Sequence, residues 1–108
     1  MTKVKRAMQT WPILLGAAHN RQTLTYTIVA DLIEMGPGTL AQVLDVIMRY
    51  CKRHGLPPLT SLVVNKHTGQ PGIGLTTLEE LNRDRERVFN FKWYALPPIQ
   101  NSDFDVSD

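Results

Sequence analysis

The chain has 108 residues, of which 43% are hydrophobic, a size that supports one small domain with one core. Its seven glycines, seven prolines and single cysteine exclude collagen-like, low-complexity and disulfide-framework proteins. No apolar run approaches the ~18 residues that a membrane span needs, so we expect neither a membrane segment nor a cleaved signal peptide. Because the lone Cys51 fits a reducing compartment, we expect a cytoplasmic protein.

Charge is distributed unevenly along the chain, although the net charge is only +2. Residues 1–55 hold seven basic and three acidic side chains, a net charge of +4, whereas three aspartates are the only charged residues after Lys92. A basic front and an acidic end suit an anionic partner such as nucleic acid, and they equally suit a solvated surface of mixed charge.

The first predicted element is a helix over residues 4–18, because apolar residues recur there on one helical face. Pro12 leaves two alternatives: a helix kinked at this residue, or a new helix that starts at Thr10 with Pro12 in its first turn. Asn20 is the predicted stop, and the short β-prone segment Arg21–Tyr26 follows.

Two more helices are expected next. Thr25 is a predicted N-cap for a helix over Tyr26–Met35, and Gly36–Gly38 predicts a turn, after which Thr39 is a second N-cap. The apolar side of the first of these helices would be formed by Ile28, Val29, Leu32 and Ile33. The second carries the strongest stripe in the sequence, made of Leu40, Val43, Leu44, Ile47, Met48 and Cys51. Gly55 suits its C-terminal end.

Alternation from Leu59 to Lys66 predicts a strand that is buried on both sides at its centre. His67–Gln70 reads as a hairpin tip in which Gly69 takes a positive φ, and Pro71–Leu75 as an irregular returning edge. Thr77 is expected to cap a helix that begins at Leu78, with a thinner stripe of Leu78, Leu81, Arg85, Val88 and Phe89. Residues 91–96 either extend this helix or form an edge strand.

This order of elements is typical of a winged helix-turn-helix, an α+β and mainly helical fold with three helices, a β-hairpin wing and an extra C-terminal helix or strand. Three helices and a hairpin also build domains that bind no nucleic acid. We expect residues 1–98 to form the single domain and residues 99–108 to be an acidic, flexible tail.

A family resemblance rests on Arg21–Tyr26, Ala30–Leu32, Leu40–Arg49 and the strand led by Pro58. Over about residues 10–75, the chain resembles the DNA-binding domain of O6-alkylguanine-DNA alkyltransferases and alkyltransferase-like proteins. The resemblance implies a helix-turn-helix, a recognition helix and a Gly-rich wing.

The active-site motif of that family is absent. Where the family reads PCHRV, this chain reads Val63–His67, give or take one register, so it lacks the thiolate that accepts an alkyl group. The recognition helix also carries bulky residues where the family keeps small ones that let the helix approach DNA closely, namely Val43, Leu44 and Ile47. We carry over the fold and the nucleic-acid surface, but neither alkyl transfer nor base flipping.

The predicted DNA-binding surface combines the outer face of the third helix, the wing tip and the segment before the helix pair. The helix N-terminus at Thr39 would accept a phosphate, whereas Asp45 in the middle of the face argues against DNA contact. The residues expected to bind DNA are Arg21, Gln22, Thr39, Gln42, Arg49, Lys52, Arg53, Lys66, His67 and Thr68.

No residue pattern points to catalysis. Cys51 lies on an apolar stripe and reads as a core residue, and the three histidines are scattered without ligand spacing. We therefore expect no metal, no cofactor and no enzymatic activity.

Two functions remain open. The first is a small DNA-binding protein, such as a regulator, that binds as a homodimer because one small winged domain offers few phosphate contacts. The second is a protein-interaction module, such as a phage or mobile-element inhibitor or adaptor of a nucleoprotein complex. Its interface would be Phe91, Trp93 and Tyr94, which with Phe89 form an aromatic cluster that otherwise serves as a lid on the core.

Overall fold

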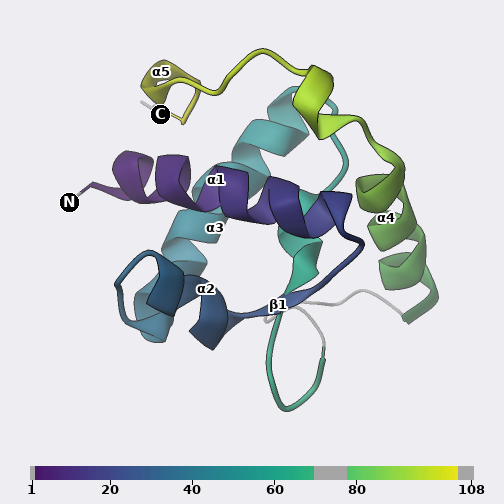
Figure 1. Cartoon of the computed structure of the whole chain (residues 1–108), viewed down its shortest axis with the longest axis horizontal. Coiled ribbons are helices and arrows are strands. Elements are labelled where there is room, and N and C mark those ends of the chain that lie inside the picture. Colours follow the sequence, from purple (N-terminus) through teal and green to yellow (C-terminus); the bar gives the residue numbers. More distant parts are fainter. Residues whose placement is uncertain (1, 70–77, 105–108) are drawn as a thin grey trace.

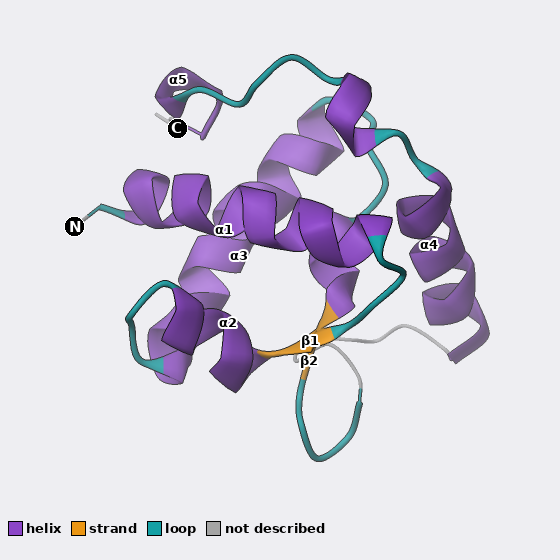
Figure 2. Cartoon of the chain, in the orientation of Figure 1, coloured by secondary structure: helices purple, strands orange, loops and turns teal. Residues whose placement is uncertain are grey.

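The computed structural model describes residues 2–69 and 78–104, which are mainly helical and include one small parallel sheet (Figures 1 and 2). This agrees with the coarse α+β, mainly helical class expected from the sequence. The elements in chain order are α1 (Lys3–His19), β1 (Leu24–Thr25), α2 (Tyr26–Leu32), α3 (Pro37–Arg53), the 3-10 helix η1 (Leu59–Leu62), β2 (Val63–Val64), α4 (Leu78–Asn90), the 3-10 helix η2 (Trp93–Ala95) and α5 (Asn101–Phe104).

Helix α1 is continuous through Pro12, so the alternative of a new helix starting at Thr10 is wrong. Its N-cap is Thr2, whose side chain accepts a hydrogen bond from the Lys5 amide at 3.2 Å. Thr10 is buried, and its hydroxyl donates to the carbonyl oxygen of Arg6 at 2.8 Å. The helix ends at its C-cap Asn20, as predicted.

Local hydrogen bonds define both ends of α2. The side chain of Thr25 accepts from the Ile28 amide at 3.1 Å, which confirms the predicted cap. The helix stops at Leu32, three residues before the predicted end, because Glu34 adopts a positive φ of 57°. Arg6 of α1 then donates to the carbonyl oxygens of Ile33 and Glu34, so α1 holds the turn that leads into α3.

The N-terminus of α3 differs from the prediction. Gly36 is the N-cap and Pro37 the first helical residue, a position where the missing proline N–H costs nothing. Gly36–Gly38 is therefore the start of the helix rather than a separate turn. Thr39 is not the cap, and its hydroxyl donates to the carbonyl oxygen of Gly36 at 3.0 Å.

The buried stripe of α3 is close to the predicted one. Leu40, Val43, Leu44, Ile47 and Cys51 are all buried, whereas Met48 is 43% exposed and Val46 is buried in its place. This shift leaves the opposite side of the helix free of the core.

The prediction of which α2 residues face the core is wrong at two positions. Ile28 and Leu32 are 47% and 59% exposed, while Val29, Ala30 and Ile33 are buried. With only seven residues, α2 has too few turns for its apolar spacing to define one face.

The predicted strand over Leu59–Lys66 is largely wrong. Residues 59–62 form η1, in which the Ser61 amide donates to the carbonyl oxygen of Pro58 at 3.0 Å, and only Val63–Val64 is extended. These two residues are buried, as expected, and pair in parallel with Leu24–Thr25 in the register Leu24 to Val63 (Figure 2). The expected returning edge at residues 71–75 and the Thr77 cap lie outside the described residues.

The C-terminal part completes the core. Helix α4 begins at Leu78, as predicted, but residues 93–95 form η2 instead of a helix extension or an edge strand. The expected flexible tail is wrong for Asn101–Phe104, which forms α5. The ring of Phe104 is fully buried, with its centroid 5.7 Å from that of Trp11 and 5.3 Å from that of Tyr50.

Candidate nucleic-acid interface

The outer face of α3 carries small and polar side chains in its first two turns. Gly38, Ala41 and Gln42 are exposed there, and a Cβ atom built on Gly38 would meet no heavy atom within 4 Å. The bulky residues that we expected to obstruct approach to DNA lie on the opposite, buried side of the helix, and they are Val43, Leu44 and Ile47. The expectation that these residues obstruct the outer face is therefore wrong, and there is open space beside the α3 backbone at Gly38.

The middle of this face is electrically balanced. Arg49 Nε lies 3.0 Å from Asp45 Oδ2, one helical turn away, and both side chains are about half exposed. Such pairs contribute little to stability. The pair does remove the objection that Asp45 would repel a phosphate, because its charge is matched by Arg49.

Lys52 and Arg53 belong to the last turn of α3. That end of the helix lies at the top of the view in Figure 1, whereas the turn after β2 lies at the bottom. At 1.5 Å per residue, Lys52 is about 20 Å along the axis from Thr39. Arg53 Nη2 donates to the backbone carbonyl of Asp103 at 2.9 Å and so helps to hold α5 against α3. The structure therefore does not unite these two cations with the expected wing residues.

The N-terminus of α3 offers few free donors for a phosphate. Pro37 has no N–H, and the Thr39 amide donates to the carbonyl oxygen of Gly36 at 3.2 Å. The expected phosphate site at Thr39 therefore has neither a free amide at Thr39 nor a capping hydroxyl.

Three predicted residues, Lys66, His67 and Thr68, are exposed on a tight turn that follows β2. The Asn65 side chain accepts from the His67 amide at 2.8 Å, and the Asn65 carbonyl accepts from the Gly69 amide at 2.8 Å. Gly69 has a φ of +68°, which confirms the predicted left-handed conformation.

Arg85 of α4 anchors this turn from behind. Its Nη2 donates to the carbonyl oxygen of Gly69 at 3.2 Å and its Nε to that of Ser61 at 3.4 Å. Partial burial lowers the pKa of its guanidinium from the ordinary value. The sequence analysis placed Arg85 on the apolar stripe of α4 but did not predict that it anchors the turn. An arginine within an otherwise apolar stripe was the feature that could have indicated this contact.

Arg21 and Gln22 lie away from α3, where the end of α1 meets α4. Arg21 Nη2 is 2.6 Å from Glu86 Oε1, and its guanidinium carbon is 4.9 Å from the ring centroid of Phe89. Gln22 is exposed, and its amide donates to the carbonyl oxygen of Ala17 at 2.9 Å. The contacts of Arg21 therefore join the chain after α1 to α4, which is a structural role.

The aromatic cluster divides into core and surface. Trp93 is buried, and its indole N–H donates to the carbonyl oxygen of Val88 at 2.8 Å, so it serves as a lid on the core. Phe91 is half-buried, with its ring centroid 4.6 Å from that of Trp93. Tyr94 is 65% exposed and is the member that a partner can contact fully.

The lone cysteine and the grouping of metal-ligating residue types bear on the expected lack of a metal site. Cys51 is buried, as predicted, and burial raises the pKa of its thiol to about 11. Within residues 2–69 and 78–104, no three His, Cys, Asp or Glu side chains are grouped to hold a metal ion. In the same part of the chain, no helix has both the length and the apolar character to cross a membrane.

Comparison of the chain with protein families, curated proteins and solved structures finds no match. The alkyltransferase resemblance therefore stays a prediction from the residues quoted for it.

Proposed function

We propose that this protein is a small, non-catalytic DNA-binding protein of winged helix-turn-helix type. Helix α3 enters the major groove by its N-terminal half, and the turn over residues 65–69 lies against the adjacent backbone. The observation that carries this proposal is the open outer face of α3 at Gly38, Ala41 and Gln42. A carboxamide such as that of Gln42 pairs with adenine in the major groove, and small neighbours allow close approach.

Positive charges that pair with no acidic side chain among residues 2–69 and 78–104 support the same surface. Lys66 is exposed on the turn, and Arg85 behind it bonds to two carbonyl oxygens, which leave its charge in place. Arg6 likewise donates to carbonyl oxygens in the α2–α3 connection, so its positive charge is also retained. Because these charges are few, one copy makes few phosphate contacts, and we expect two copies to bind together.

Fluorescence anisotropy with a labelled random-sequence duplex tests the proposal. We expect micromolar binding that weakens roughly tenfold or more between ~50 and ~200 mM salt. Gly38→Glu places bulk and negative charge on the open face, where the added Cβ atom meets no heavy atom within 4 Å, and we expect it to abolish binding. The matched control Arg87→Glu changes an exposed residue of α4 and should retain most of the affinity. Absence of binding at low salt, or full binding by Gly38→Glu, would refute the proposal.

A protein-interaction module is the second candidate, and the exposed apolar pair on α2 favours it. Ile28 and Leu32 are one helical turn apart and are 47% and 59% exposed. This pair, rather than the expected Phe91, Trp93 and Tyr94 as a group, would form the interface, and a second copy of the chain is its simplest partner. Sedimentation analysis decides: concentration-dependent dimerisation that Ile28→Lys abolishes, without any DNA binding, would favour this function over the first.

A further inference from the structure

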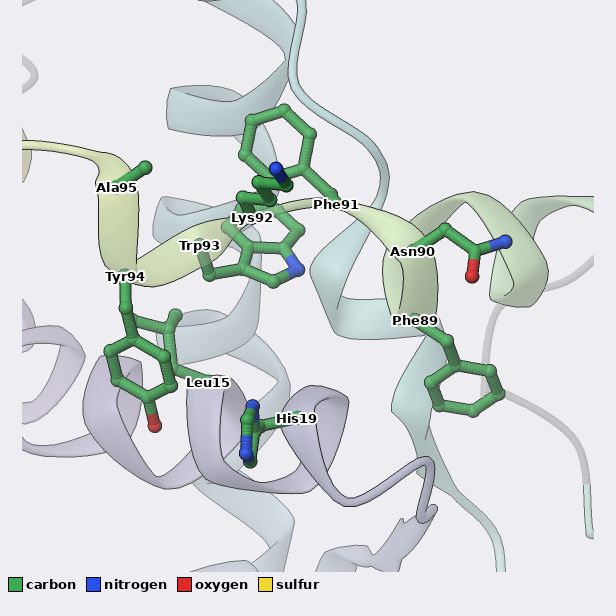
Figure 3. A pocket seen from close by; sticks show the side chains of 9 residues that line it. All are labelled: Leu15, His19, Phe89, Asn90, Phe91, Lys92, Trp93, Tyr94 and Ala95. Carbon is green, nitrogen blue, oxygen red and sulfur yellow. The ribbon is translucent and has the colours of Figure 1, made fainter.

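A half-open cavity of about 410 Å³ lies between the C-terminal part of α1, the end of α4 and η2, away from α3 (Figure 3). In Figure 3 the ring of Tyr94 stands on the left and that of Phe89 on the right, and the indole of Trp93 and the ring of His19 lie between them. The volume is in the range of small-molecule sites, which are typically apolar and aromatic with a few polar groups.

The aromatic walls are held in place by the fold. The indole of Trp93 is fixed by its 2.8 Å hydrogen bond to the Val88 carbonyl. His19 and Tyr94 meet edge to face, with centroids 5.8 Å apart, and Phe89 is covered by the Arg21 guanidinium that Glu86 holds. A ring that enters the cavity therefore finds its stacking surfaces already ordered, which lowers the entropic cost of binding.

The charged group in the lining is positive. Lys92 is the only formally charged residue among the nine that line the cavity, and no carboxylate is present. A second cavity of about 260 Å³ shares Leu15, Trp93 and Tyr94 with the first and is otherwise lined by apolar residues. The site thus combines planar apolar walls with one exposed ammonium group, and a neutral apolar ligand would leave that group unused.

We propose that this cavity binds a small planar aromatic molecule that carries a negative charge. Its ring packs among Trp93, Phe89 and Tyr94, and its anionic group pairs with Lys92. An aromatic carboxylate and a nucleoside monophosphate share this chemistry, and the experiment separates them. The proposal does not depend on DNA binding, because the cavity and the outer face of α3 share no residue.

Isothermal titration of the full chain with four probes tests the site. The probes are 1-naphthoate, adenosine monophosphate, the neutral 1-naphthalenemethanol and the non-aromatic cyclohexanecarboxylate. We expect one of the two aromatic anions to bind at least about tenfold more tightly than the neutral and the non-aromatic probes. The anion that binds more tightly shows whether the natural ligand is an aromatic carboxylate or a nucleoside monophosphate.

Two exposed positions provide the variants. Lys92→Gln should reduce the affinity for the aromatic anion to that of the neutral probe, and Tyr94→Ala should weaken the aromatic anion and the neutral aromatic probe together. Lys52→Gln removes an ammonium group that is likewise exposed, at the end of α3, and should change neither affinity. The proposal is wrong if neither aromatic anion binds at millimolar concentration, if Lys92→Gln binds like the wild type, or if cyclohexanecarboxylate binds equally well.

Discussion

The guanidinium of Arg85 donates a hydrogen bond to the carbonyl oxygen of Gly69 across 3.2 Å, and this bond joins α4 to the turn after β2. A two-residue strand gives such a turn little support of its own. Arg85 also contacts the Ser61 carbonyl in η1, so one side chain fixes both the start and the end of the segment. The geometry of the proposed wing therefore depends on a residue outside it.

Arg85→Gln should loosen this turn. We expect hydrogen exchange at the Gly69 amide, which donates to Asn65, to accelerate about tenfold or more, because the turn opens more often. Arg87→Gln is the matched control, since Arg87 is exposed and pairs only weakly with Asp84 at 3.8 Å. Unchanged exchange in Arg85→Gln would mean that the turn is held by other contacts.

The same variant predicts a coupling in DNA binding. If Arg85 acts by positioning Lys66, then Arg85→Gln and Lys66→Ala should weaken binding by similar factors, and the double variant should be no weaker than either. Lys52→Ala, at the far end of α3 and outside the proposed surface, should change the affinity little, either alone or combined with Arg85→Gln. Additive losses for Arg85 and Lys66 would contradict positioning, whereas a wild type without DNA affinity would leave the exchange result valid and refute only the proposed function.

Two glycines should respond to alanine in opposite directions. Gly38 lies in the first turn of α3 with open space around it, and Gly38→Ala should stabilise the protein by about 0.5 kcal/mol through helix propensity. Gly55 has a φ of +64°, so Gly55→Ala should destabilise it by about 1 kcal/mol, although its surroundings are equally open. Urea denaturation of both variants measures the difference; equal effects would contradict the assigned backbone conformations.

The sequence predicted those features that depend on neighbouring residues. Thr25 caps α2, Gly69 adopts a positive φ, and most of the stripe from Leu40 to Cys51 is buried, because each follows from side-chain chemistry or spacing within a few residues. The start of α3 was predicted wrongly because Gly36–Gly38 suits a turn as well as a helix N-terminus. The residues alone do not distinguish the two, and the structure shows the helix N-terminus.

Features that depend on distant partners were not predictable. The parallel pairing of Leu24 with Val63 requires the fold to bring two segments together, and no local pattern specifies it. The contact of Arg85 with Gly69 likewise joins residues whose proximity follows from the placement of α4. The candidate DNA surface was predicted as one patch, but the length of α3 separates Lys52 and Arg53 from the turn after β2.

Cys51 should be unreactive in the native protein. Burial raises the pKa of its thiol from 9.0 to about 11, so the thiolate fraction at pH 8 is about a hundredfold below that of an exposed cysteine. Because the folded pKa exceeds the unfolded one, this group favours folding fully below about pH 9, and its contribution falls as the pH rises towards 11. Labelling by a disulfide reagent at pH 8 should therefore become rapid only in urea; equally fast labelling without urea would contradict the burial.

Phe104→Ala tests whether the C-terminal segment belongs to the domain. Phe104 is fully buried and contacts the rings of Trp11 and Tyr50, so its truncation opens a cavity between α1, α3 and α5. Such a change costs about 3 kcal/mol in a well-packed core. Ser102→Ala, an exposed change in the same short helix, is the control and should cost almost nothing. Urea denaturation followed by tryptophan fluorescence measures both, and a loss below ~1 kcal/mol for Phe104→Ala would mean that the aromatic core is complete without α5.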